Sequence, residues 1–218
     1  IEAYFIWFQR STHSKIEDAY PELRSEEYLK NLDRSGFIDY FFRFAQEGGK
    51  IQSGGYRTAG LFKRTIEDKF EEFRNYVLEP YNEKFNIDSW LLQTNNFLYF
   101  GGGIATIFLN RIDKNRFAIV NNKSRDGVKA LGYAVKGDLV DQYHCIENAQ
   151  KDLMKEFPLI KNFFMADAIN QFLIGEKEGE PYLIKLTHSD NSGTLKPIDH
   201  NYWIFQCNPD NYAIVKKW

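Results

Sequence analysis

The sequence predicts a mainly α-helical domain over residues 1–187, followed by the start of a second, α+β domain. Two observations carry this prediction. Apolar residues recur at helical spacing through most of the chain, and glycine or proline marks the ends of these segments. The composition is 43% hydrophobic and 17% aromatic, which supplies enough apolar surface for a packed core and argues against disorder.

The expected helices follow one another along the chain. Ser25 is suited to cap a short helix, and Ser35 could cap the next. Residues 49–60 hold four glycines and are expected to form a loop. An aromatic cluster predicts a helix at 4–8, and longer helices are predicted over 36–47, 61–78, 87–98, 103–111, 122–131, 138–156 and 161–174.

The pattern changes after residue 175. The apolar run at 181–186 predicts a strand, and the polar, glycine-bearing stretch 188–199 predicts a linker. Residues 200–218 then begin a further domain, with a strand at 202–206 and a helix that starts near Pro209. The chain has no initiator Met and stops inside a periodic segment, so we expect it to be a piece of a longer protein.

Charge and cysteine content limit the possible functions. The net charge is −2 and the isoelectric point is about 6.1, so any nucleic-acid-binding surface has to be local. The two cysteines and four histidines show no metal-ligand spacing, and we expect no metal, no cofactor and a reducing, cytoplasmic compartment. No apolar run approaches the ~20 residues that span a bilayer, so no membrane partner is expected.

The most informative stretch is 97–109, where one apolar segment runs into three glycines and a second apolar segment follows. Glycine permits a sharp turn between helices, and the second helix then begins with N–H groups that bind phosphate. Thr106 stands where a dinucleotide fingerprint needs a small residue, so a helix-hairpin-helix fits better. Close packing of two helices is the alternative. The expected phosphate-binding residues are Gly101, Gly102, Gly103, Ile104 and Ala105.

Local basic charge favours phosphate contact. Residues 110–131 hold six basic residues against two aspartates, and residues 49–65 hold four basic residues and no acid. Basic, glycine-bearing loops suit phosphate because backbone N–H groups and cationic side chains approach it together. Ordinary solvated loops are the alternative for either stretch. The predicted DNA contacts are Lys123, Ser124 and Arg125, with a second contact at Lys50 and Arg57.

The order of hairpin, helix, loop and Phe117-Ala118-Ile119-Val120-Asn121 resembles the core of the helix-hairpin-helix DNA glycosylases. In that family a catalytic Asp follows the hairpin helix, and the matching position here is Asn121 or Asn122. An amide cannot act as the general base that a carboxylate provides. The resemblance therefore implies a glycosylase-like scaffold without its catalyst, with both asparagines at the DNA. An active glycosylase, the first alternative, would need Asp113 or Asp126.

The segment 202–212, Tyr-Trp-Ile-Phe-Gln-Cys-Asn-Pro-Asp-Asn-Tyr, resembles the opening of an EVE domain, a relative of the YTH readers of modified bases. Residues 48–57 and 103–132 resemble the region that precedes an EVE domain and an AAA+ motor in McrB-type restriction proteins. This implies a non-catalytic target-recognition module of a modification-dependent restriction and phage-defence protein. Its partners would be DNA carrying a modified base and the AAA+ motor. A second alternative is a protein-interaction scaffold that docks this motor without touching DNA.

Overall fold

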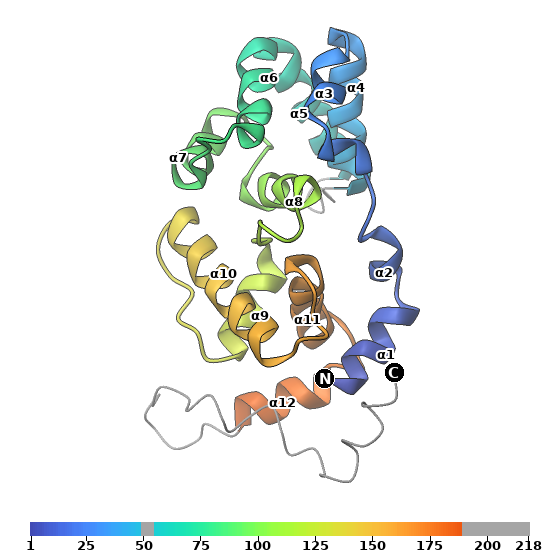
Figure 1. The fold of residues 1–218 in the computed structure, drawn as a ribbon, viewed down its shortest axis with the longest axis vertical. Helices are drawn as coiled ribbons and strands as arrows, with labels where there is room; N and C mark the ends of the chain where they lie inside the picture. Colours follow the sequence, from blue (N-terminus) through green and yellow to red (C-terminus); the bar gives the residue numbers. More distant parts are fainter. Residues whose placement is uncertain (49–54, 189–218) are drawn as a thin grey trace.

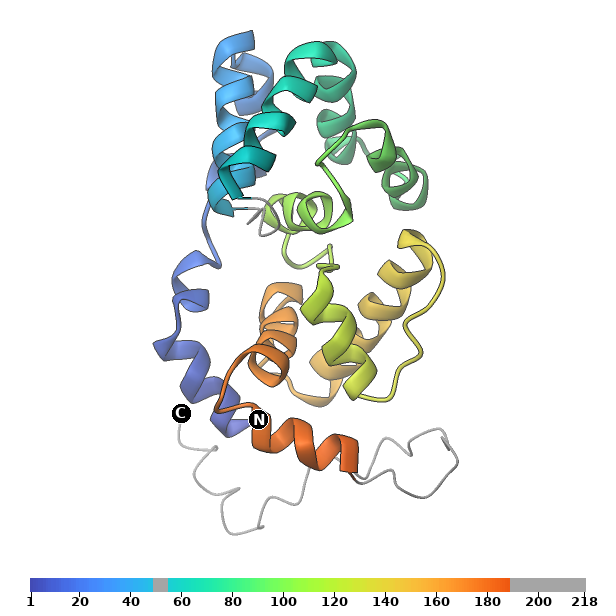
Figure 2. The same ribbon diagram turned by 180° about the vertical axis from the view of Figure 1, so that it is seen from behind.

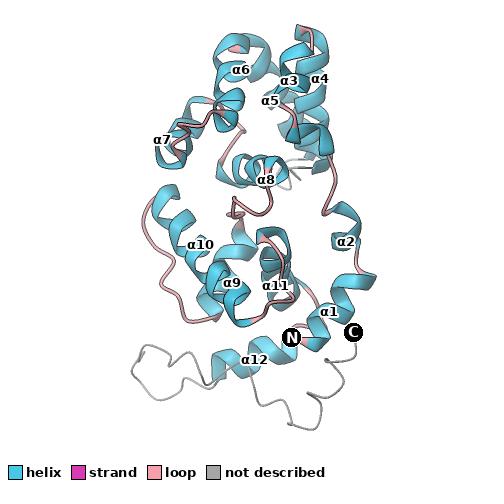
Figure 3. Ribbon diagram, viewed as in Figure 1, coloured by secondary structure: helices cyan, strands magenta, loops and turns pink. Residues whose placement is uncertain are grey.

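The computed structural model describes residues 1–48 and 55–188, and within these ranges the chain is helical and contains no strand (Figure 3). The mainly α prediction is confirmed there. The predicted linker, the start of the EVE-like domain and Lys50 lie outside the described residues. The elements are α1 (Glu2–Arg10), α2 (Thr12–Ile16), η1 (Pro21–Arg24), α3 (Glu26–Asn31), α4 (Arg34–Arg43), η2 (Phe44–Gly48), α5 (Gly55–Asp68), α6 (Phe70–Leu78), η3 (Glu79–Tyr81), α7 (Ile87–Gln93), η4 (Thr94–Asn96), α8 (Gly102–Ile112), α9 (Asn122–Ala130), α10 (Leu139–Glu156), α11 (Phe163–Gly175) and α12 (Glu180–His188).

The helices form two groups with α8 between them (Figure 1). One group contains α3 to α7, and the other contains α9 to α12 together with α1. The view from behind shows the same division (Figure 2). The chain passes from one group to the other through α2 and η1, and it crosses back through α8. The helix with the three glycines at its start therefore lies at the junction of the two groups.

Aromatic side chains fill the core beside α8. Phe73 is fully buried, and its ring centroid lies 5.2 Å from that of Phe97 and 5.1 Å from that of Phe100. Tyr76 stacks on Trp90 with centroids 4.4 Å apart, and the Trp90 Nε1–H donates to the Tyr76 carbonyl at 2.8 Å. Such ring pairs stabilise the core beyond the area they bury. Because Phe97 and Phe100 belong to this core, both ends of the glycine-bearing turn are anchored.

Several predicted boundaries differ from the observed ones. The helix predicted over 61–78 is two helices, α5 and α6, which break at Lys69 (φ −117°, ψ 40°), and α5 begins inside the predicted loop. The break lets Phe70 at the start of α6 pack its ring 5.5 Å from that of Phe37. The cap of α4 is Asp33 rather than Ser35, since the Asp33 carboxylate accepts the Gly36 N–H at 2.7 Å.

The strand predicted at 181–186 is wrong, because these residues lie in helix α12. Pro181 stands in the first turn of this helix, where its missing N–H costs nothing. The preceding Gly179 packs so closely on α11 that an added Cβ would lie 1.9 Å from the Phe172 carbonyl oxygen. This contact places the beginning of α12 against α11. The helical unit extends to His188, one residue beyond the predicted end of the domain.

Candidate nucleic-acid interface

A turn joins two helical segments as predicted, but it lies at residues 97–101 rather than at the three glycines. The helix predicted over 87–98 ends as α7 and η4 at Asn96, and Gly102 and Gly103 belong to α8. Phe97 and Phe100 are buried, whereas Leu98 and Tyr99 between them are 67% and 42% exposed. Tyr99 has φ 69°, a left-handed conformation that is uncommon for a bulky residue, and it reverses the chain. The turn therefore projects two apolar side chains into solvent and delivers the chain directly into α8.

The amino-terminus of α8 faces solvent and has no side-chain cap among the described residues. Gly101 is the N-cap residue, is exposed, and has open space where a Cβ would stand. The N–H groups of Ile104 and Ala105 bond back to the Gly101 carbonyl at 3.0 and 3.1 Å. The first N–H groups, those of Gly102 and Gly103, point out of the helix, where an anion would bind them.

The five hairpin residues predicted to hold phosphate differ in what they can contribute. Gly102 packs against α10, because a Cβ there would lie 2.5 Å from Leu139 Cδ1 and that side chain would have to shift. The side chains of Ile104 and Ala105 are buried in the core, so these two residues can offer a ligand only backbone atoms. The groups that this stretch can offer to a ligand are therefore the backbone N–H groups around Gly101.

A hydroxyl joins the first turn of α8 to the start of α9. The Val120 N–H donates to Thr106 Oγ1 at 2.9 Å, and the Thr106 hydroxyl donates to the Gly102 carbonyl at 2.7 Å. Since Leu139 lies against Gly102, the amino-terminal turns of α8, α9 and α10 meet at one place. Their dipoles add a positive potential there. The sequence showed Thr106 only as a departure from a nucleotide motif, and its linking role was missed.

The two asparagines matched to a catalytic Asp are bonded within α9. Asn121 is its N-cap: Asn121 Oδ1 accepts the Ser124 N–H at 2.9 Å, and the Asn121 N–H donates to Ser124 Oγ at 3.2 Å. This is a capping box. Asn122 is exposed, and its Oδ1 accepts from Arg125 Nη1 at 3.2 Å. Ser124, predicted as a DNA contact, is fully buried, so its hydroxyl serves the cap.

Two of the three basic residues of α9, Lys123 and Arg125, are partly directed toward the protein. Arg125 Nε donates to Gln142 Oε1 at 2.5 Å, and partial burial lowers the pKa of Arg125. Lys123 Nζ lies at the carboxyl end of α11, because a Cβ added at Gly175 would be 2.5 Å from it. The Gln142 bond fixes the Arg125 guanidinium beside the first turn of α10.

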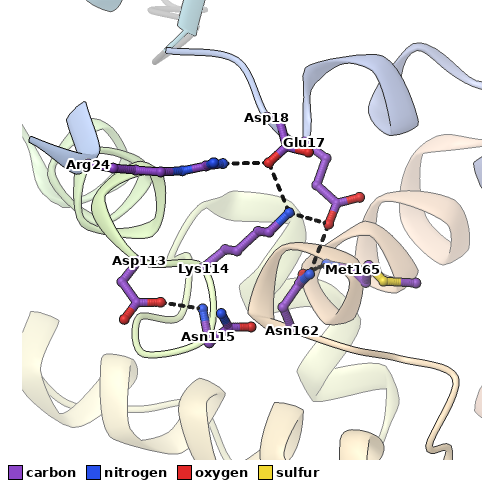
Figure 4. A network of polar contacts seen from close by, with 8 residues as sticks. All are labelled: Glu17, Asp18, Arg24, Asp113, Lys114, Asn115, Asn162 and Met165. Atoms are coloured by element: carbon purple, nitrogen blue, oxygen red, sulfur yellow. Dashed lines mark hydrogen bonds and ion pairs between the residues drawn. The ribbon is translucent and has the colours of Figure 1, made fainter. Parts of the chain in front are cut away.

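The predicted basic stretch 110–131 does not form one surface. Lys114 Nζ pairs with Glu17 Oε1 at 2.8 Å and with Asp18 Oδ1 at 3.0 Å, and the same network includes Arg24 and Asn162 (Figure 4). This network ties the segment before η1 to the loop after α8 and to the start of α11. Lys114 is therefore a structural cation at the junction of the two helix groups.

Two other basic residues of this stretch stack on aromatic rings of the protein. Arg111 is 6% exposed, stacks 4.9 Å from the Phe164 ring centroid, and has its pKa lowered to about 10 by burial. The Arg116 guanidinium lies 4.7 Å from the Phe117 ring centroid. In the second basic stretch, Arg57 is exposed near the start of α5, a helix that packs against α4 and α6. At the hairpin itself, Lys69 Nζ donates to the Asn96 carbonyl at 3.2 Å and lies 6.0 Å from the Phe97 ring centroid, while the basic residues of α9 lie on the helix whose start bonds to the first turn of α8.

Neither carboxylate proposed for an active glycosylase suits that role. Asp113 lies after the last residue of α8, at the end opposite the glycines, and its Oδ1 accepts the Asn115 N–H at 2.9 Å (Figure 4). Asp126 is an exposed residue of α9 whose carboxylate lies 3.8 Å from Lys129 Nζ. Neither side chain is directed to the hairpin in these contacts, so they give the glycosylase alternative no support.

A carboxylate that sequence reasoning missed, Asp167 of α11, meets the start of α9. Its Oδ1 accepts from Ser124 Oγ at 2.5 Å, and its Oδ2 accepts from Asn121 Nδ2 at 3.4 Å. Burial raises the pKa of Asp167 to about 6, although these hydrogen bonds act in the opposite direction. The available sequence signal was a lone acid within the apolar segment 163–175.

Two searches of the described ranges and three comparisons with known proteins add no other candidate. Residues 1–48 and 55–188 contain no group of three or more potential metal ligands and no helix with the length and apolarity to cross a bilayer. No family model, curated protein or solved structure matches the chain significantly. The hairpin and the start of α9 are therefore the candidate site.

Proposed function

We propose that this chain is a non-catalytic DNA-binding module that holds a backbone phosphate at the amino-terminus of α8. One observation carries the proposal. The start of α8 has no side-chain cap and is exposed at Gly101. The buried ring of Phe100 and the Thr106 hydroxyl hold this helix start in place. Such a site suits an anion that approaches the backbone closely. Arg125 of the adjoining α9, held beside the first turn of α10 by Gln142, adds positive charge on this side of the protein.

This arrangement suits contact with the DNA backbone rather than reading of bases. Helix N–H groups and basic side chains bind phosphate oxygens, which position a protein on DNA without reporting its sequence. Choice of a modified base would then belong to another part of the protein. The resemblance to the region that precedes an EVE domain and an AAA+ motor supports a place in a modification-dependent restriction and phage-defence protein.

The test is binding of a fluorescent duplex over a range of salt concentrations. The double variant Lys123→Glu, Arg125→Glu should weaken binding at low salt and reduce the slope of log affinity against log salt by about 1 to 2. The matched control is Lys15→Glu, Lys155→Glu, which makes the same charge change at two exposed positions, one in α2 and one in the last turn of α10. Unaltered affinity in the α9 variant would show that the hairpin assignment is wrong.

A protein-interaction scaffold for an AAA+ motor is the second candidate. The observation in its favour is the pair Leu98 and Tyr99, two neighbouring apolar side chains exposed at the tip of a rigid turn. Leu98→Ser, Tyr99→Ser should then abolish a complex with the motor region of the same protein, measured by gel filtration. If no duplex shifts at any salt concentration while this complex forms, the scaffold replaces the DNA-binding module.

A further inference from the structure

A groove of about 530 Å³ lies between α6 and the segment formed by the end of α7 and η4. Its first wall is one face of α6 continued into η3, where the lining residues recur at helical spacing. Its second wall ends at Phe97, the first residue of the turn. Five of the lining side chains end in a carboxylate or an amide: Glu72, Asn75, Glu79, Gln93 and Asn96. The groove therefore offers hydrogen-bond acceptors and negative charge.

An ammonium group of the protein lies at one end of this groove. Lys69 Nζ donates to the Asn96 carbonyl oxygen at 3.2 Å and lies 3.7 Å from Glu72 Oε2. The same nitrogen lies 6.0 Å from the Phe97 ring centroid. A carboxylate, a carbonyl and an aromatic ring are thus satisfied by one cation. The groups of this groove suit a positively charged partner.

The end of the groove at Glu79 has groups of the same kind. Glu79 lies about 10 Å further along the helix axis than Glu72. It is partly buried and forms no ion pair with a residue of the described ranges. Gln93 Nε2 donates to the Ser89 carbonyl at 3.3 Å, which leaves Gln93 Oε1 to accept from a ligand. This end therefore has a carboxylate and an amide oxygen without the cation that Lys69 supplies at the other.

A guanidinium matches these acceptors better than an ammonium. It carries five N–H donors in a fixed planar fork that bonds several oxygens together, whereas an ammonium is a compact point charge. The aliphatic stem of an arginine also packs on apolar groups, which Tyr76 and Leu78 supply in the lining. The carboxylates repel phosphate, so the charge of the groove selects a cationic occupant and not nucleic acid.

Exposed apolar side chains beside the groove indicate that the arginine belongs to a peptide chain. Leu92 and Leu98 are 55% and 67% exposed, and they stand next in sequence to the lining residues Gln93 and Phe97. Since neighbouring Cα atoms are about 3.8 Å apart, both leucines lie at the rim. Apolar residues on either side of a bound arginine would cover them, whereas a free small cation would leave them in water.

We propose that this groove binds an arginine-bearing, partly apolar segment of a partner protein. The guanidinium pairs with the Glu79 carboxylate and donates to the side-chain oxygens of Asn75 and Gln93. The neighbouring apolar residues of the segment pack on Leu92 and Leu98. This site is separate from the DNA contact at the start of α8 and does not depend on it.

The experiment is an NMR titration of the ¹⁵N-labelled protein with the peptide Gly-Leu-Arg-Leu-Gly at about 0.15 M salt, where long-range attraction is screened. The side-chain amides of Asn75 and Gln93 should shift saturably. The same peptide with citrulline in place of arginine, which keeps the shape without the charge, should leave them unmoved. Glu79→Gln should weaken binding by about 5- to 10-fold, because it removes a charge-assisted pair. Glu71→Gln, the same change at an exposed position of α6 outside the lining, should bind like wild type.

A second variant fills the site from within. Asn75→Lys places an ammonium three residues after Glu72 and four residues before Glu79, within reach of both carboxylates. Position 75 is exposed, so the variant should keep the helical circular dichroism of wild type and lose the peptide. Absence of a saturable shift, equal binding of the citrulline peptide, or unchanged binding in either groove variant overturns the proposal. N-acetylarginine amide that binds as tightly as the peptide would show a small-molecule site and overturn the partner segment.

Discussion

Replacing Gly101 by Asp is expected to stabilise the protein and weaken its binding to DNA at the same time. Gly101 is the N-cap residue of α8, with φ −63° and ψ 170°, which is the extended conformation that N-cap residues adopt. Its Cβ position is open, so the new side chain fits without displacing a neighbour. The Asp carboxylate would accept the Gly103 N–H, one of the donors assigned to phosphate.

The magnitude follows from three contributions. An Asp cap exceeds a Gly cap by a few tenths of a kcal/mol. A negative charge at a helix start adds about 0.3–1 kcal/mol, and loss of glycine's freedom in the unfolded chain adds about 0.4–1 kcal/mol. The free energy of unfolding should rise by about 1 kcal/mol, which shifts the midpoint of thermal unfolding by about 3 °C in a domain of this size.

Thermal unfolding followed by circular dichroism and duplex binding followed by anisotropy provide the two readouts. DNA affinity should fall by at least about 10-fold at 0.1 M salt, because the carboxylate occupies the phosphate position and repels the anion. Gly101→Ala is the matched control: it adds a Cβ without a cap or charge, and it should bind DNA like wild type. A stabilised Gly101→Asp protein with unchanged DNA affinity would show that phosphate does not bind at the start of α8.

Three further predictions concern stability. Folding raises the pKa of Asp167, so the stability that this residue contributes is present below its ordinary pKa of 3.8 and is lost as the pH rises through about 6. Asp167→Asn should therefore raise the free energy of unfolding at pH 7.5 by up to about 3 kcal/mol and leave it unchanged at pH 3.5. Urea unfolding at the two pH values measures both effects. Burial lowers the pKa of His144, but the bond to Asp88 at 2.7 Å outweighs it and raises the pKa. The stability that His144 contributes is therefore present at acidic pH and lost as the pH rises through the raised pKa. His144→Gln should lower the free energy of unfolding by less than about 1 kcal/mol, and only at acidic pH, because the pair is exposed. Gly127→Ala would place a Cβ 2.6 Å from Asn170 Cβ, so we expect a loss of about 1–3 kcal/mol and a lower thermal midpoint, and a more stable variant would contradict this close helix packing.

Helices with clear periodicity and local end signals were predictable. Residues 138–156 were predicted as one helix, and α10 covers 139–156 with Asp138 as its cap. The run at 181–186 was not predictable in this way, because a segment of six residues contains too little period to distinguish strand from helix. The contact of Gly179 with the Phe172 carbonyl decides the outcome, and such a tertiary contact leaves no local pattern.

The candidate site was predictable in its glycines and much less so in its polar contacts. Thr106 and Val120 are 14 residues apart, and Asp167 and Ser124 are 43 residues apart, so spacing could not reveal either bond. Basic density along the chain was also misleading. Lys114 is a structural cation in an ion-pair network, and a count of charges cannot separate such residues from those on a binding surface.

Binding of phosphate to the first N–H groups of α8 can be observed by titrating the ¹⁵N-labelled protein with a short duplex and following the backbone amide shifts. The Gly102 and Gly103 amides should show the largest downfield proton shifts, and these shifts should be lost in Gly101→Asp. Saturable DNA binding that leaves both amides unmoved, with shifts confined to other helices, would contradict phosphate binding at this helix start.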